Sequence, residues 1–163
     1  MIFVSKSGYL KYKNLKFKCA LGEAGIGNKK EEGDNITPKG TYKVIEIYYR
    51  KDRIKKIISQ IRAIRIKKSM GWCDDQKSKR YNQLIKLPSQ FSHEKLHRKD
   101  NIYDLILVLN YNIKPTIKNK GSAIFIHVAK KNYEKTAGCI ALKKNHLIYL
   151  IKEIKKKTRV LID

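Results

Sequence analysis

The sequence has few acidic residues for its length. It contains only 14 Asp and Glu residues but 38 Lys and Arg residues, which gives a formal net charge of +24 over 163 residues. A surplus of this size favours negatively charged partners such as nucleic acid, anionic lipid or an acidic cell-wall polymer. The lysines are spread from Lys6 to Lys157 rather than gathered in one arm. This spread favours non-specific attraction, and a basic nucleic-acid binder without catalysis stays as one alternative.

Cysteine and long apolar runs are also scarce. The three cysteines, Cys19, Cys73 and Cys139, are an odd number without a C-x-x-C pair, so a disulfide framework is not indicated. No apolar run reaches transmembrane length, and residues 1–6 lack the long apolar region of a secretory signal. We expect a soluble protein in which no export signal is visible.

The glycine-rich stretch from Gly22 to Gly40 carries no nucleotide-binding motif. Its Gly25-Ile-Gly-Asn-Lys-Lys segment lacks both the G-x-x-x-x-G-K-[ST] pattern and the third glycine of a dinucleotide site. We interpret the stretch as a loop and expect no cofactor.

The remaining pattern predicts a mainly β fold with one or two helices (α+β), in a single domain over residues 1–163. Apolar residues recur at helical spacing near 143–156, which predicts a C-terminal helix. Residues 52–68 are ambiguous and are expected to form a short helix that turns into an extended segment. Alternating or continuous apolar residues predict strands at 2–4, 9–12, 41–49, 103–110, 122–128 and 159–162.

His93-Glu-Lys-Leu-His97 matches the H-E-x-x-H pattern of zinc hydrolases, in which two histidines on one helical face bind the metal. That motif needs a sustained helix, and Pro88 lies just upstream. We therefore expect no metal site and interpret the segment as a polar helical turn, with a zinc hydrolase on His93 and His97 as a lower alternative.

A histidine and a cysteine twelve positions apart are the strongest candidates for chemistry. His127 lies at the end of an expected strand, and Gly138-Cys139 follows a polar segment. Along that strand Ile124, Ile126 and Val128 are expected to face one way, and Phe125 and His127 the other. A histidine beside a thiol raises its thiolate fraction, and backbone N–H groups at Gly138 and Cys139 can stabilise an oxyanion.

His127 followed by Thr136-Ala-Gly-Cys-Ile140 resembles the catalytic motif of the L,D-transpeptidase (YkuD-type) family. Segments such as Thr37-Pro-Lys-Gly40, Gly71-Trp-Cys-Asp-Asp75, Tyr81-Asn82 and Gly121-Ser-Ala-Ile-Phe125 look similar too, so the likeness covers about residues 20–163. The resemblance implies a β-barrel or sandwich and acyl transfer on peptidoglycan stem peptides in the cell envelope. It implies that Cys139 is the nucleophile, that His127 is its base and that Gly138 shapes the turn.

The likeness leaves substrate selection open. Many relatives carry His or Arg before the glycine and Arg two positions after the cysteine, whereas this sequence has Ala137 and Ala141. The same site with water as acceptor would make an L,D-carboxypeptidase or hydrolase. The Trp72 loop could line a substrate groove, and Trp72 could equally plug one end of a barrel. The possible substrate-binding residues are Ser122, Thr136, Trp72, Asp75, Asn82 and His93.

Overall fold

Strands with alternating inward and outward side chains close into a barrel. In the computed structural model, which describes residues 1–163, the ring runs β6–β11–β12–β13–β3–β2–β1–β14 and returns to β6. β7 (Ala63–Arg65) adds to β6 outside the ring. The ring strands are β1 (Ile2–Ser5), β2 (Tyr9–Tyr12), β3 (Leu15–Ala20), β6 (Gly40–Tyr49), β11 (Leu105–Leu109), β12 (Phe125–Val128), β13 (Ile140–Leu142) and β14 (Arg159–Ile162). The predicted mainly β barrel fold is confirmed.

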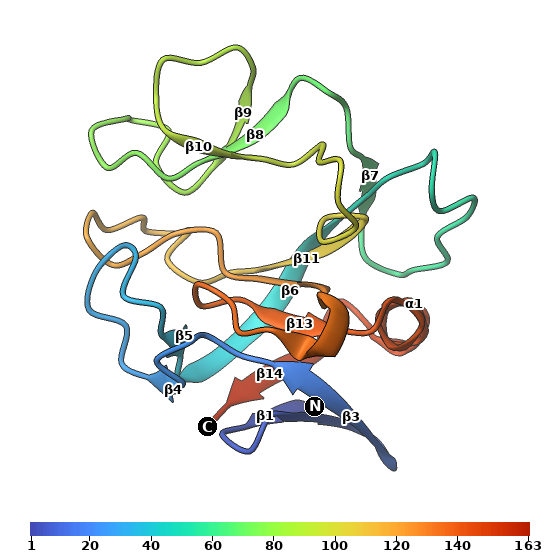
Figure 1. Ribbon diagram of the computed structural model, residues 1–163. Coiled ribbons are helices and arrows are strands. Elements are labelled where there is room, and N and C mark those ends of the chain that lie inside the picture. Colours follow the sequence, from blue (N-terminus) through green and yellow to red (C-terminus); the bar gives the residue numbers. More distant parts are fainter.

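The core consists of the inward-facing apolar side chains of the barrel, and one helix packs against it from the side (Figure 1). All five residues of β11 are buried, as expected for a strand with neighbours on both edges and cover on both faces. The helix α1 (Lys144–Glu153) adds Leu147, Leu150 and Ile151 to the same core. The predicted C-terminal helix is thus present, slightly shorter than expected.

A second, smaller sheet lies at the end of the barrel away from the N-terminal hairpin (Figure 1). It consists of β10 (His93–Lys95), β8 (Met70–Cys73) and β9 (Leu84–Lys86) in that order. A separate apolar cluster includes Trp72 and Leu96 from this region with Ile106 and Phe125 from the barrel. The short pair β4 (Ile26–Gly27) and β5 (Thr37–Pro38) and the 3-10 turn η1 (Lys131–Tyr133) complete the structure.

Residues 52–68 form no helix, which corrects the expectation for their first part. Ile54 and Ile61 are buried in the main core, whereas Ile58 is 58% exposed, so the apolar residues do not share one helical face. The end of the segment pairs with β6, where Ile47 N–H donates to Arg62 O. This extended end agrees with the prediction for the second part of the segment.

The expected strand 122–128 begins only at Phe125, because Gly121 and Ala123 both have positive φ, +87° and +51°. Within the strand the predicted facing holds. Ile126 and Val128 join the main core, while Phe125 joins the second cluster. No helix of the structure has the length and apolar character needed to span a membrane.

Candidate active site

Cys139 lies directly before β13, at the end of a turn that begins at Thr136. Its Sγ–H donates to the carbonyl oxygen of Ala123 at 3.1 Å, and the N–H of Phe125 donates to Sγ at 3.4 Å. The positive φ of Ala123 turns the segment before β12 so that both backbone groups reach the sulfur. The thiol is therefore held between a backbone acceptor and a backbone donor that can stabilise its thiolate.

The turn itself is fixed by the Thr136 hydroxyl. Thr136 Oγ1 donates to Cys139 O at 2.6 Å and accepts from Gly138 N–H at 3.2 Å. Gly138 has φ +130°, and a Cβ there would lie 2.8 Å from Ile36 O. Glycine is required at this position by both backbone conformation and space.

A second glycine holds the turn from behind. Gly22 pairs with Thr136 as an isolated β-bridge, supported by Thr136 N–H donating to Leu21 O and Glu23 N–H donating to Thr136 O, each at 2.9 Å. A Cβ on Gly22 would lie 2.2 Å from Asn35 O and 3.0 Å from the Cα of Gly138. The close approach of these two glycines therefore fixes the position of the turn that carries Cys139.

His127 is placed by β12, between Ile106 on β11 and Ala141 on β13. Its side chain is buried, and Nδ1 lies 2.9 Å from Val128 O, so the tautomer with a proton on Nδ1 leaves Nε2 as an acceptor. The Tyr103 ring packs edge-to-face against the imidazole, with centroids 5.5 Å apart. Burial, aided by the charge of Arg98, lowers the pKa of His127 to about 4, although the Val128 hydrogen bond and Asp100 oppose the shift.

Cys139 and His127 line one hollow, named here the thiol pocket. Other lining residues include Glu32, Asp74, Glu94 and Ser122. No hydrogen bond joins the thiol to the imidazole, because the thiol donates to Ala123 O instead. Burial raises the pKa of Cys139 to about 12, and the negative charge of Glu94 acts in the same direction, while Phe125 N–H and Lys29 oppose it. The pair is thus neutral at rest, with an acceptor nitrogen able to take the thiol proton as the sulfur attacks.

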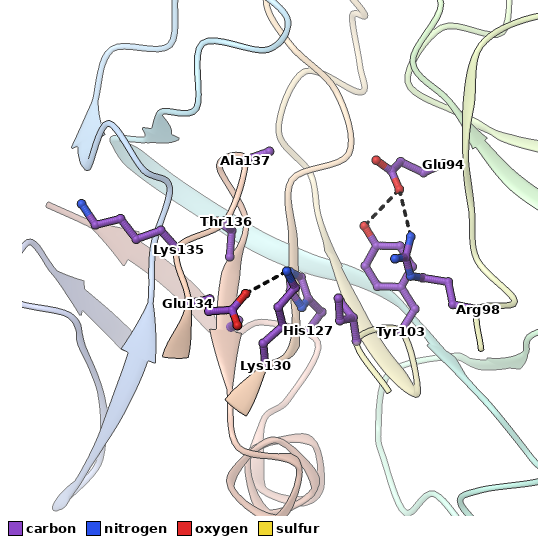
Figure 2. Close-up of a pocket in the computed structure, with 11 residues that line it drawn as sticks. Glu94, Arg98, Tyr103, His127, Lys130, Glu134, Lys135, Thr136 and Ala137 are labelled. Atoms are coloured by element: carbon purple, nitrogen blue, oxygen red, sulfur yellow. Dashed lines mark hydrogen bonds and ion pairs between the residues drawn. The ribbon is translucent and has the colours of Figure 1, made fainter. Parts of the chain in front are cut away.

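A second hollow, the side pocket, shares His127 with the thiol pocket and is also lined by Glu94, Arg98, Tyr103, Lys130, Ala137 and Ala141, among others. Figure 2 shows Tyr103 and Arg98 directed toward Glu94, and Lys130 paired with Glu134. The small side chains of Ala137 and Ala141 leave this space open beside the imidazole.

The segment that carries Arg98 and Tyr103 is anchored by a buried carboxylate. Asp104 is almost fully buried and accepts from Arg53 at 2.7 Å and from Lys144 at 2.9 Å. Val128 N–H also donates to Ile102 O at 3.0 Å. These contacts tie the segment to the barrel, to α1 and to the strand that carries His127.

Of the predicted substrate-binding residues, Ser122 and Thr136 line the thiol pocket and Trp72 and Asn82 do not. Trp72 and Asn82 are 4% and 2% exposed, and Trp72 Nε1 donates to Asn82 Oδ1 at 2.9 Å. The groove interpretation of the Trp72 loop is corrected: β8 carries Trp72 into the core, where it packs edge-to-face on Phe125. The buried position of Trp72 agrees better with the alternative hypothesis, in which the tryptophan plugs one end of the barrel.

Asn82 has a supporting position that the sequence did not reveal. Its Oδ1 also accepts from Ala123 N–H at 3.0 Å, and its Nδ2 donates to the carbonyls of Tyr111 and Asn112. Since Ala123 O is the acceptor for the Cys139 thiol, Asn82 orients the segment on which the sulfur rests.

Asp75 and His93 lie outside the thiol pocket. Asp75 accepts from the N–H groups of Lys77 and Ser92, which stabilises its own loop. His93 Nδ1 lies 2.6 Å from Phe91 O, and the ring faces a separate hollow beside Pro88. The prediction of a helical turn at His93–His97 is wrong, because residues 93–95 form the strand β10. The two histidines cannot share a helical face there, so the zinc hydrolase alternative lacks its motif.

The expected pair of oxyanion donors is reduced to one. Gly138 N–H already donates to Thr136 Oγ1, whereas Cys139 N–H has no acceptor within the protein. Cys139 N–H is therefore the backbone donor free to bind a developing oxyanion.

Glu94, Arg98, Tyr103 and Glu32 line the two pockets and were missed by sequence reasoning. A signal for Glu94 was present. Residues 93–95 form a strand, and neighbouring side chains on a strand point to opposite faces. Interpreting His93–His97 as a strand would therefore have predicted that Glu94 and His93 face opposite ways. Glu32 lies in an irregular loop, where no periodicity indicates direction.

The family model of the L,D-transpeptidase catalytic domain, YkuD, matches residues 1–162. Among solved structures, the chain resembles the helical cell shape determining protein Pgp2 from Campylobacter jejuni, with 18% identity and a TM-score of 0.49. The match covers 99% of this chain and 46% of that one, so the chain spans about half the length of that protein. No protein of curated function matches the sequence. With the family model covering nearly every residue, the chain belongs to the YkuD family of L,D-transpeptidase catalytic domains, which act on peptidoglycan.

Proposed function

We propose that this protein is a cysteine acyltransferase that acts on peptidoglycan stem peptides through an acyl-enzyme on Cys139. The observation that carries the proposal is the thiol pocket, in which a buried histidine with an acceptor Nε2 lines the same hollow as a thiol held by backbone groups. Membership of the L,D-transpeptidase family supplies the substrate class.

In the first half-reaction Cys139 Sγ attacks the carbonyl carbon of the L-centre residue of a tetrapeptide stem, usually diaminopimelate. The thiol proton moves to His127 Nε2 as the C–S bond forms, which requires the thiol to rotate away from Ala123 O. Cys139 N–H donates to the oxyanion of the tetrahedral intermediate. The C–N bond then breaks, the terminal D-alanine leaves with the proton from His127, and a thioester remains.

In the second half-reaction an amine of another stem attacks the thioester carbonyl. The new C–N bond forms, the C–S bond breaks, and one amine proton passes through His127 to the sulfur. The product is a 3→3 cross-link or a related amide. When water attacks instead, the same site acts as an L,D-carboxypeptidase or hydrolase, which is the second candidate function.

The setting proposed for this activity is the cell envelope, where the family typically works. The +24 charge supports it, because a basic surface attracts an anionic wall polymer over a distance of about one Debye length, roughly 8–10 Å.

The test measures D-alanine release and new amide from a tetrapeptide stem, with and without an acceptor amine. We expect release by the wild-type protein and none by Cys139→Ala, with Cys19→Ala as the matched control, since Cys19 is a buried core thiol outside the pocket. Activity that persists in Cys139→Ala would contradict the proposal. Cleaved peptide alone in excess acceptor would favour the hydrolase over the transpeptidase.

A further inference from the structure

The thiol pocket has the opposite charge to the rest of the molecule. Lysine and arginine outnumber acids by 38 to 14 in the chain, yet the charged side chains that line this pocket are Glu32, Asp74 and Glu94 with a single lysine, Lys29. Lys29 Nζ is paired with Asp34 at 2.5 Å, so its charge is already balanced. The lining of the thiol pocket is therefore net negative in a strongly basic protein, with Arg98 of the side pocket the nearest cation to Glu94, at 4.0 Å.

Glu94 is the acidic residue that lines both the thiol pocket and the side pocket, on the face toward Arg98. Its contacts are loose, with Tyr103 Oη at 3.5 Å and Arg98 Nη1 at 4.0 Å (Figure 2). Burial raises the pKa of Glu94, and the nearby negative charges of Asp74 and Glu32 raise it further. Arg98 and the Tyr103 hydroxyl oppose this shift without cancelling it, so a cation bound at Glu94 would stabilise the charged carboxylate further.

Two polar atoms in the same pocket lack partners. Ser122 is 5% exposed and lines the pocket, and its Oγ makes no hydrogen bond. It lies near the Tyr81 hydroxyl, whose proton is donated to Glu32. Asp74 Oδ1 is also buried without a partner. Buried polar atoms without partners are rare in folded proteins, and a hydrogen-bond donor bound in the pocket would satisfy both of these acceptors.

We propose that the thiol pocket binds a protonated amine of the substrate through the carboxylates of Glu32, Asp74 and Glu94 and the Ser122 hydroxyl. The proposal rests on the proposed function for the identity of the substrate, but not for the chemistry of the bound group. An ammonium group has three N–H donors and no acceptor, which matches a pocket wall of acceptors.

The bound amine has two possible sources in a stem peptide, the side chain of the acyl donor and the attacking acceptor. An acceptor binds as R–NH3⁺ and releases one proton to solvent. The resulting R–NH2 attacks the thioester, forming the C–N bond and breaking the C–S bond while its second proton passes through His127 to Sγ. An amine on the side chain of the acyl donor would instead stay protonated, and its role would be to position the donor peptide.

A binding experiment tests the pocket without turnover. Iodoacetamide alkylation of Cys139 is followed by intact mass, with rising concentrations of N-acetyl-lysine amide or its amine-acetylated counterpart. We expect the ammonium compound to slow alkylation and the acetylated one to do so at least about tenfold less effectively, as charge-assisted hydrogen bonds imply. In Glu94→Gln and Asp74→Asn that preference should fall about tenfold. Glu31→Gln is the matched control, since Glu31 is exposed next to Glu32 and outside the pocket.

Two kinetic arms then distinguish the sources. If the amine belongs to the donor, Glu94→Gln lowers the ratio of acylation rates for stems with free and acetylated side-chain amines. If it belongs to the acceptor, Glu94→Gln lowers the ratio of amide to hydrolysis product. An equal preference for both compounds in the wild-type protein, or a preference unchanged in Glu94→Gln and Asp74→Asn, overturns the proposal. Absence of any acyl-enzyme in the wild-type protein would instead contradict the proposed function and leave the alkylation result to decide the ammonium site.

Discussion

Burial keeps both Cys139 and His127 uncharged, with the pKa of the thiol raised to about 12 and that of the imidazole lowered to about 4. The site therefore does not store a thiolate–imidazolium pair. In the proposed mechanism, reactivity depends on proton transfer during attack, on Phe125 N–H beside the sulfur and on the unpaired N–H of Cys139.

The low pKa of His127 predicts an unusually acidic limit for acylation. The imidazole must be neutral to accept the thiol proton, so the rate falls as the pH drops through about 4 rather than through the ordinary value of 6.5. Between pH 5.5 and 7 we expect less than about a twofold change. The measurement is the rate of Cys139 acylation by a stem peptide from pH 3.5 to 8.

Burial also raises the pKa of Glu94, whose titration could contribute to the profile. The profile is therefore repeated in Glu94→Gln, where the limb assigned to His127 should persist. A midpoint near 6.5 in both proteins would show that the imidazole is not held in its neutral form, contrary to this account.

Asn82 is expected to matter for stability as well as for the thiol. Asn82→Ala removes the bonds to Trp72, Ala123, Tyr111 and Asn112 and places alanine at φ +57°. The unpaired buried groups and the backbone strain together predict a loss of about 3 kcal/mol in urea unfolding. Asn145→Ala, at an exposed position on α1, should change stability by less than about 0.5 kcal/mol. A loss below about 1 kcal/mol in Asn82→Ala would remove its supporting role.

At the scale of elements, the site is a meeting of two segments, the Thr136–Cys139 turn and the Gly121–Ile124 approach to β12. The sequence motif indicated both segments, because they flank His127 and Gly138-Cys139 within a short stretch of the chain. The close packing of Gly22 against Gly138 was not predictable, since it depends on how β3 and the loop after it lie against the turn.

Gly22→Ala tests that packing. Its Cβ would meet Asn35 O at 2.2 Å and Thr37 N at 2.9 Å, so backbone must move and the turn of Cys139 with it. We expect a loss of at least about 2 kcal/mol by thermal unfolding and a changed rate of Cys139 alkylation. Gly27→Ala is the control, because its Cβ would meet only Ile36 Cγ2 at 3.7 Å and should change stability by about 1 kcal/mol or less. Equal behaviour of the two variants would show that the glycine contact does not set the turn.

Over the whole molecule, periodicity predicted the barrel strands and α1 because each has one buried face. It failed at Trp72 and His93, where short strands of three or four residues give too little alternation to separate them from loops or turns. It also failed for the first part of residues 52–68, where Ile54 and Ile61 are buried and Ile58 is exposed without a helix, although the extended end that was predicted is present as β7. The acidic wall of the thiol pocket could not be predicted either, since Glu32, Asp74 and Glu94 are brought together only by the fold.

The central claim is that Cys139 forms an acyl-enzyme with a peptidoglycan stem peptide, and intact-mass analysis of the protein with a tetrapeptide stem or a carbapenem-type acylating agent tests it most directly. We expect one adduct per chain, mapped by peptide analysis to Cys139, retained in Cys19→Ala and lost in Cys139→Ala. An adduct on another residue, or turnover of the stem peptide by Cys139→Ala, would contradict it.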